Sequence, residues 1–372
     1  MNCLLTGATG IVGSHILFEW LHTALTTSKI NHLYVVIRAN QHTAKDRLLQ
    51  ILNDSNKPSN LNSFSPEELI SKITVIDSDL KTLQLHHFKA LQIDSIIHCA
   101  GSTNLMPSGD TENLVNEQNF EVTKHLLHTF KREIKRFIYI STAYSFGIQK
   151  DKVDDFIENH TINQFRNPYE ASKYESETYV KQFCKSHQII SQILRPSIVC
   201  GRLIEPPFFE TPKFDVFYSW PMFLNKYAQH CKEHFRIWID KKSGLNIVPV
   251  DFVAKTVIHA VLHPEITELN IVNPKQILHK DYVGHVLKSF RINSFEFTSK
   301  KPEHLNPFET LYYKSIGVLF EKYVSIPDLQ FNAEGILKVI ETLDLNINLD
   351  VHSNFMKLVD FSVEKNFRKS YS

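Results

Sequence analysis

The chain has 372 residues, of which 42% are hydrophobic and 11% aromatic, so it can bury a large core and is neither a disordered segment nor a coiled coil. Its 41 lysine and arginine residues nearly balance its 40 aspartate and glutamate residues, and a formal charge of +1 gives no field that would attract nucleic acid or an anionic membrane. The five cysteines are scattered and no window approaches 18 continuous apolar residues. We therefore expect a cytoplasmic protein without a disulfide framework or a transmembrane segment.

The first half of the chain alternates short apolar segments with segments of helix length. We expect six strands, each followed by a helix, at residues 2–6, 32–38, 73–77, 94–99, 136–141 and 189–194. Parallel strands need crossover connections, so this order predicts an α/β protein with a doubly wound parallel sheet, the Rossmann fold. The ligand crevice of such a sheet lies at the carboxyl ends of its strands.

The first predicted strand leads directly into a glycine-rich turn. Gly7, Gly10 and Gly13 stand three residues apart and are followed by the amphipathic start of a helix. A tight turn and the close approach of a pyrophosphate both need residues without a Cβ, and a helix N-terminus offers unpaired N–H groups. The turn therefore predicts a dinucleotide-binding site.

The second predicted strand ends in Arg38, at the position that should lie beside the adenosine ribose. NAD-binding proteins usually carry an acidic residue there, which accepts a hydrogen bond from the 2′-hydroxyl. A guanidinium group instead matches a 2′-phosphate, so we expect NADP(H) as the cofactor, with Arg47 as a second contact. The alternative is that Arg38 is an ordinary surface arginine.

A tyrosine and a lysine four residues apart follow the fifth predicted strand. Pro168 suits a first helical turn, so Tyr169 and Lys173 should share one helix face. We expect the ammonium group to lower the pKa of the phenol, which could then exchange a proton near neutral pH. The preceding strand ends in Ser141 and Thr142, and Thr142 is our candidate for holding a substrate carbonyl. Alternatively, the two hydroxyl groups only cap the following loop, and the Tyr–Lys pair is an exposed helix pair.

After Gly201 the alternation fades into a segment rich in proline and aromatic residues, and then into mainly helical sequence. We expect an NADP-binding domain at 1–202, to which 243–275 returns. A smaller, mainly helical C-terminal substrate-binding subdomain should comprise 203–242 and 276–372.

Over residues 2–275 the chain resembles the extended short-chain dehydrogenases/reductases. The matching pieces are TGATGIVG, the strand end Asp79-Leu80, IIHCAG, Asn119 at the start of a helix, FIYISTAYSFG, NPYEASKYESE, ILRPSIVCG and LNIVPVDFVA. Within that group, YVVIRANQHTAKDRL is similar to the second strand and following helix of fatty acyl-CoA reductases and thioester-reductase domains, the male-sterility-type NAD-binding family.

The resemblance implies roles for individual residues. It places Thr142, Tyr169 and Lys173 in catalysis. Tyr169 and Lys173 should also touch the cofactor. The glycine turn adds Gly13 to the predicted cofactor site, and the segment after the second strand adds Arg47. The remaining implied contacts are Gly7, Thr9, Gly10, Ile11 and Val12 with the pyrophosphate, Arg38 with the 2′-phosphate, Asp79 and Leu80 with adenine, Ala100 with the ribose side, and Pro196, Ser197 and Ile198 with the nicotinamide.

The expected activity is NADPH-dependent reduction of an acyl thioester to an aldehyde, with a second reduction to the alcohol left open. The thioester would arrive on coenzyme A or on a separate acyl or peptidyl carrier protein. Two alternatives are an NAD(P)-dependent sugar-nucleotide epimerase or dehydratase and a hydroxysteroid-type dehydrogenase; a third is a non-catalytic NADP-sensing regulator. Cys231 and His234 form one isolated pair, so we predict no metal site.

Overall fold

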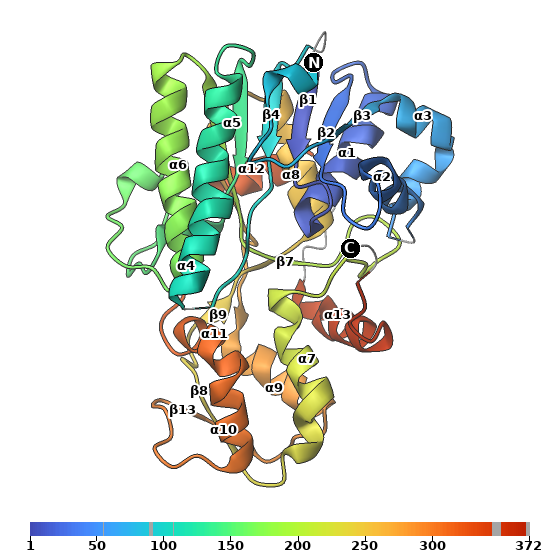
Figure 1. Cartoon of the computed structure of the whole chain (residues 1–372). Coiled ribbons are helices and arrows are strands. Elements are labelled where there is room, and N and C mark those ends of the chain that lie inside the picture. Colours follow the sequence, from blue (N-terminus) through green and yellow to red (C-terminus); the bar gives the residue numbers. More distant parts are fainter. Residues whose placement is uncertain (55, 89–91, 107, 344–350, 370–372) are drawn as a thin grey trace.

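A parallel β-sheet forms the centre of the molecule (Figure 1). The computed structural model describes residues 1–372 except 55, 89–91, 107, 344–350 and 370–372. Within these residues the sheet has seven strands in the order β11-β6-β5-β4-β1-β2-β3, and every pair is parallel. The strands are β1 (Cys3–Thr6), β2 (Leu33–Ile37), β3 (Ile73–Asp77), β4 (Ser95–His98), β5 (Arg136–Ile140), β6 (Ile190–Pro196) and β11 (Glu268–Ile271).

This topology confirms the predicted doubly wound α/β fold. The central strands are almost wholly buried, which explains why their sequences are continuous apolar runs rather than alternating ones. The chain order reverses at β1, whose neighbours are β2 and β4. A ligand crevice is therefore expected at the carboxyl ends of β1 and β4.

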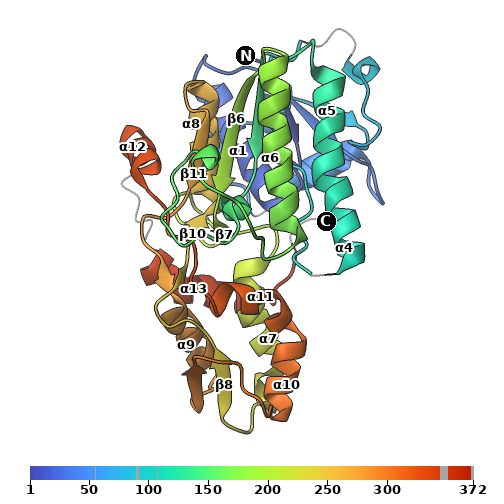
Figure 2. The same ribbon diagram turned by 90° about the vertical axis from the view of Figure 1, so that its left-hand side faces the viewer.

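Helices cover both faces of the sheet (Figure 2). On one face α1 (Ile11–Thr26), α2 (Ala44–Asn53) and α8 (Val250–Leu262) bury their apolar sides in a common core. On the other face α5 (Val122–Phe130) and α6 (Pro168–Ser186) do the same. Shorter elements at the sheet's periphery are α3 (Pro66–Ser71), α4 (Gly109–Val115) and a π-helical segment, Asn116–Glu121.

Beyond the carboxyl edge of the sheet lies a second group of helices (Figure 1), which enclose a core rich in aromatic side chains. Five helices contribute to it: α7 (Ser219–Tyr227), α9 (His279–Ser289), α10 (Pro307–Lys314), α11 (Ile316–Val324) and α13 (Val351–Glu364). Short strand pairs accompany them: β7 (Ile198–Cys200) with β10 (Ile247–Pro249), β8 (Phe235–Trp238) with β13 (Phe295–Thr298), and β9 (Gly244–Leu245) with β12 (Ile277–Leu278).

The C-terminal third departs from the expected division of the chain in one place. Helix α12 (Glu334–Thr342) packs against β11 and buries Ile336 and Val339 in the core of the large sheet. Residues 276–372 therefore do not lie as a whole on the substrate side, because the apolar side of α12 covers the β11 end of the sheet. Among the described helices, none is both long enough and apolar enough to cross a membrane.

Candidate active site

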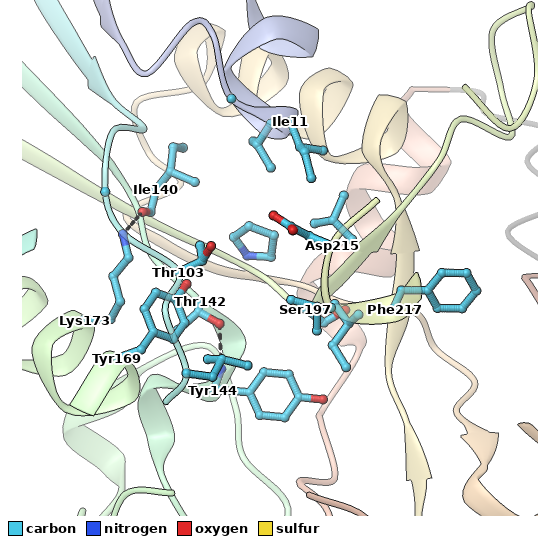
Figure 3. A pocket seen from close by; sticks show the side chains of 18 of the residues that line it. Ile11, Thr103, Ile140, Thr142, Tyr144, Tyr169, Lys173, Ser197, Asp215 and Phe217 are labelled. Atoms are coloured by element: carbon cyan, nitrogen blue, oxygen red, sulfur yellow. Dashed lines mark hydrogen bonds between the residues drawn. The ribbon is translucent and has the colours of Figure 1, made fainter. Parts of the chain in front are cut away.

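A cavity of about 260 Å³ lies at the carboxyl edge of the sheet, between the sheet and the aromatic core (Figure 3). It brings together much of the site predicted from the sequence. The predicted residues that line it are Gly7, Gly10, Ile11, Val12, Gly13, Thr142, Tyr169, Lys173, Pro196, Ser197 and Ile198. The predicted residues that lie outside its lining are Thr9, Arg38, Arg47, Asp79, Leu80 and Ala100.

The glycine turn has the geometry that a pyrophosphate requires. Gly7 has a φ of +77°, and a Cβ there would stand 2.6 Å from the backbone nitrogen of Ala100. A Cβ on Gly13 would stand 2.0 Å from the carbonyl oxygen of Gly7. No side chain caps the start of α1, so its first N–H groups remain available to an anion. These features fit a dinucleotide, whose phosphates can approach this backbone directly.

Arg38 lies at the far end of β2, where its side chain is 72% exposed and pairs with Asp79 at 2.8 Å. Arg47 donates a hydrogen bond from Nη1 to the carbonyl oxygen of Arg38 at 2.6 Å. Partial burial and the neighbouring charge of Arg38 lower the pKa of Arg47. Two guanidinium groups therefore stand close together beside the predicted adenosine position.

The start of α6 fixes the Tyr–Lys pair in the cavity. The side chain of Asn167 caps the helix and Pro168 occupies its first turn. Tyr169 and Lys173 both reach the cavity wall, and Lys173 Nζ donates to the carbonyl oxygen of Ile140 at 2.8 Å (Figure 3). The ammonium group is thus held at the end of β5, beside the phenol.

The expected lowering of the Tyr169 pKa is wrong for this structure. Burial raises the pKa of the phenol, and the charge of Lys173 and a hydrogen bond with Thr142 lower it by less. The phenol is therefore protonated at neutral pH. A protonated phenol can donate to an oxygen that becomes negative, which suits the reduction of a carbonyl group.

The structure separates the two hydroxyl groups at the end of β5. Ser141 donates a hydrogen bond to the buried carboxylate of Glu177. Thr142 Oγ1 accepts a bond from the backbone N–H of Tyr144 at 3.3 Å, so it does cap the following turn. That bond uses only a lone pair, so the O–H of Thr142 can donate to the phenol oxygen of Tyr169 or, in its place, to a substrate oxygen in the cavity.

Asn119 is one of the residues that carry the family resemblance, and the structure gives it contacts that the sequence did not predict. It lies in the π-helical segment, a conformation frequent at functional sites. Its side chain accepts from Ser102 N at 2.7 Å and donates to Ser172 Oγ on α6 at 2.9 Å. Asn119 therefore ties the loop after β4, which lines the cavity, to the helix that carries Tyr169.

A buried charged cluster also stands behind the cavity, and sequence reasoning missed it. Tyr144 and Tyr323 line the cavity with their rings 5.6 Å apart, and the guanidinium of Arg166 lies 5.7 Å and 5.2 Å from their centres. Arg166 pairs with Glu170 at 3.5 Å and with Asp328 at 3.6 Å. Burial raises the pKa of Asp328 to about 7, although the charge of Arg166 opposes this.

The glycine turn, the hydroxyl-bearing strand end and the Tyr–Lys pair on one parallel sheet define an extended short-chain dehydrogenase/reductase. The chain belongs to the male sterility protein family, whose profile matches residues 5–257.

Similar proteins support this assignment. Fatty acyl-CoA reductase 1 of Mus musculus is 26% identical over 381 residues, covering 90% of this chain and 70% of that protein. A dTDP-D-glucose 4,6-dehydratase of Dictyostelium discoideum is 29% identical over 210 residues; this chain covers 44% of its length, less than half. The terminal R domain from the myxalamid PKS-NRPS pathway superposes with a TM-score of 0.68 at 19% identity, covering 100% of this chain and 92% of that domain, which shows the shared fold.

Proposed function

We propose that this protein reduces acyl thioesters with NADPH, giving an aldehyde and a free thiol. One observation carries the proposal: Thr142, Tyr169 and Lys173 line the same cavity as the glycine turn. This cavity continues into the aromatic core. Similarity to a fatty acyl-CoA reductase along 90% of the chain supports an acyl group as the substrate.

The proposed chemistry assigns each cavity residue a task. When bound, the reduced nicotinamide supplies a hydride to the thioester carbon. Tyr169 and Thr142 donate hydrogen bonds to the carbonyl oxygen, which gains negative charge, and Tyr169 gives it a proton. Lys173 places its ammonium group beside the phenol, and a hydrogen bond from Nζ to the carbonyl oxygen of Ile140 keeps it there. The carbonyl then re-forms as the carbon–sulfur bond breaks: the hydroxyl proton returns to the oxygen of Tyr169, and the leaving thiolate takes a proton from water to become the free thiol.

The test of this function is NADPH oxidation with acyl-CoAs, acyl groups loaded on carrier proteins, aldehydes and sugar nucleotides. We expect oxidation with a thioester to release free thiol and aldehyde in equal amounts. Turnover of an aldehyde would show whether the reduction continues to the alcohol. Absence of oxidation with every thioester, together with turnover of a sugar nucleotide, would replace this function.

A sugar-nucleotide epimerase or dehydratase is the second candidate, because a dehydratase is among the relatives. Such enzymes use the same tyrosine and lysine, and in this superfamily they usually keep NAD tightly bound. The guanidinium groups of Arg38 and Arg47 favour NADP instead, which makes this candidate the weaker one. A regulator that senses NADP would bind the cofactor and turn over none of these substrates.

Arg38→Asp should reverse the cofactor preference. Loss of a charge-assisted contact of about 1.5–3 kcal/mol should raise the KM for NADPH by about 10- to 100-fold, because the 2′-phosphate would then face a carboxylate. The KM for NADH should fall, since an acidic residue accepts from the 2′-hydroxyl. Steady-state kinetics with both cofactors measure this.

Arg132→Asp is a suitable control for this charge reversal, because Arg132 is exposed and outside the cavity lining. It should leave both KM values unchanged. An Arg38→Asp variant that kept the wild-type preference for NADPH would contradict the assignment of Arg38.

A further inference from the structure

The part of the cavity away from the glycine turn is lined by large apolar side chains. Phe217, Trp220, Tyr282, Phe320 and Val324 form this aromatic end. They come from α7, α9, α11 and the segment before α7, so the aromatic core itself supplies the wall. Aromatic side chains at such a surface favour another ring packed edge-on or offset against them.

The aromatic end is closed behind by the same core. Trp220 is 1% exposed and packs on Tyr312 with 4.9 Å between ring centres. Tyr282 packs on Phe355 at 5.0 Å, and its hydroxyl donates to the carbonyl oxygen of Phe217 at 3.0 Å. Tyr312 and Phe355 do not line the cavity. Trp220 and Tyr282 thus separate the cavity from the two rings behind them.

An ion pair also lines the cavity, two residues before Phe217. Lys213 and Asp215 line the cavity, pair with each other, and have side chains that are 37% and 41% exposed, so they stand where the cavity meets solvent. The carboxylate of Asp215 points into the cavity (Figure 3). The ion pair offers a polar, solvent-exposed contact for the thiol arm of a thioester, whose acyl group would then lie toward Trp220.

The volume limits what the aromatic end can hold. A cavity of about 150 Å³ is enough to bind a benzene ring. The cavity here has about 260 Å³, and the nicotinamide ring must occupy part of it beside Tyr169. The space left corresponds to about one more ring, so a long saturated chain would have to leave the cavity on its solvent-exposed side.

We propose that the acyl group of the substrate is compact, of the size of one aromatic ring, and that long fatty acyl groups are poor substrates. This inference rests on the proposed thioester reduction and specifies its substrate class. The closed wall of Trp220 and Tyr282 sets the limit of size.

The test is a series of acyl-CoAs compared by kcat/KM with NADPH: benzoyl, hexanoyl, decanoyl and palmitoyl. Benzoyl-CoA and hexanoyl-CoA should exceed palmitoyl-CoA by at least about tenfold, because one misplaced methylene group in an apolar pocket already changes discrimination by 10-fold or more. A preference for palmitoyl-CoA would overturn the size limit and leave thioester reduction intact. If no thioester reacts while an aldehyde or a sugar nucleotide does, both the size limit and the proposed function are overturned.

Trp220→Leu should move the preference toward longer chains. The indole N–H of Trp220 has no hydrogen-bond partner, so this substitution opens the wall without breaking a hydrogen bond. The ratio of palmitoyl-CoA to hexanoyl-CoA in kcat/KM should rise by about tenfold. An unchanged ratio in a folded variant would contradict the assignment of the wall.

Phe223→Leu is the matched control. Phe223 lies on the same helix, is buried, and packs on Phe308 and Tyr312 without lining the cavity. This variant also loses a buried ring, yet its acyl-length profile should match the wild type. A shift as large as that of Trp220→Leu would trace the effect to general loosening of the aromatic core and would overturn the role of Trp220.

Discussion

Tyr169→Phe should lower kcat for thioester reduction by about 10²- to 10⁴-fold, the usual contribution of a positioned proton donor. The substitution removes the hydroxyl that would donate to the carbonyl oxygen, while the ring still fills its place in the cavity wall. NADPH affinity should stay close to wild type, because the glycine turn and Arg38 are untouched. Turnover kinetics and a fluorescence titration of NADPH measure the two quantities separately.

Tyr174→Phe is the control for this substitution. Tyr174 lies on the same helix and packs beside Phe165, outside the cavity lining. It should retain wild-type turnover. Wild-type turnover in Tyr169→Phe would remove the tyrosine from the mechanism.

Lys173 offers a less direct test, since its ammonium group also bonds the end of β5 and lies over the ring of Tyr139 at 4.6 Å.

The features that the sequence revealed are those whose causes are local. The glycine turn closes within a few residues, with Gly10 N donating to Gly7 O at 2.9 Å. The start of α6 depends on Asn167 and Pro168, which adjoin Tyr169. The six predicted strands coincide with strands of the sheet because each is short and rich in apolar, β-branched or aromatic residues. The order of these local features along the chain was enough to predict a doubly wound parallel sheet, but not its seventh strand.

The features that the sequence concealed depend on distant contacts. The seventh strand, β11, begins with Glu268, a charged residue that no strand pattern favours. Its carboxylate is buried because Arg195 pairs with it at 2.5 Å from the neighbouring strand. Asp328 bonds Tyr144 across 184 residues of chain, so no spacing could indicate the cluster around Arg166. The pKa of Tyr169 likewise follows from burial that only the folded chain creates.

Arg166→Met should destabilise the protein by about 3–5 kcal/mol at pH 8, the usual cost of leaving buried carboxylates without their cation. Arg166 pairs with Glu170 and Asp328, and all three side chains are no more than 1% exposed. The charge of Arg166 lowers the pKa of both carboxyl groups, against the effect of burial. Its removal should therefore raise both pKa values further above those of the unfolded chain.

The sign of the pH dependence distinguishes this mechanism from a simple loss of packing. A carboxyl group whose pKa is raised on folding stabilises the folded state at low pH, and that stability is lost as the pH rises through the folded pKa. Asp328 already has a pKa of about 7 in the wild type, so it is largely protonated at pH 5 and needs its cation least there. The loss in free energy of unfolding caused by Arg166→Met should consequently be small at pH 5 and large at pH 8, as urea unfolding at the two pH values would measure.

Adding Asp328→Asn to Arg166→Met should recover part of this loss in free energy of unfolding at pH 8, because one buried carboxylate is then gone. Equal deficits at both pH values, unaffected by Asp328→Asn, would mean that Arg166 stabilises the cavity wall only by its bulk against Tyr144 and Tyr323.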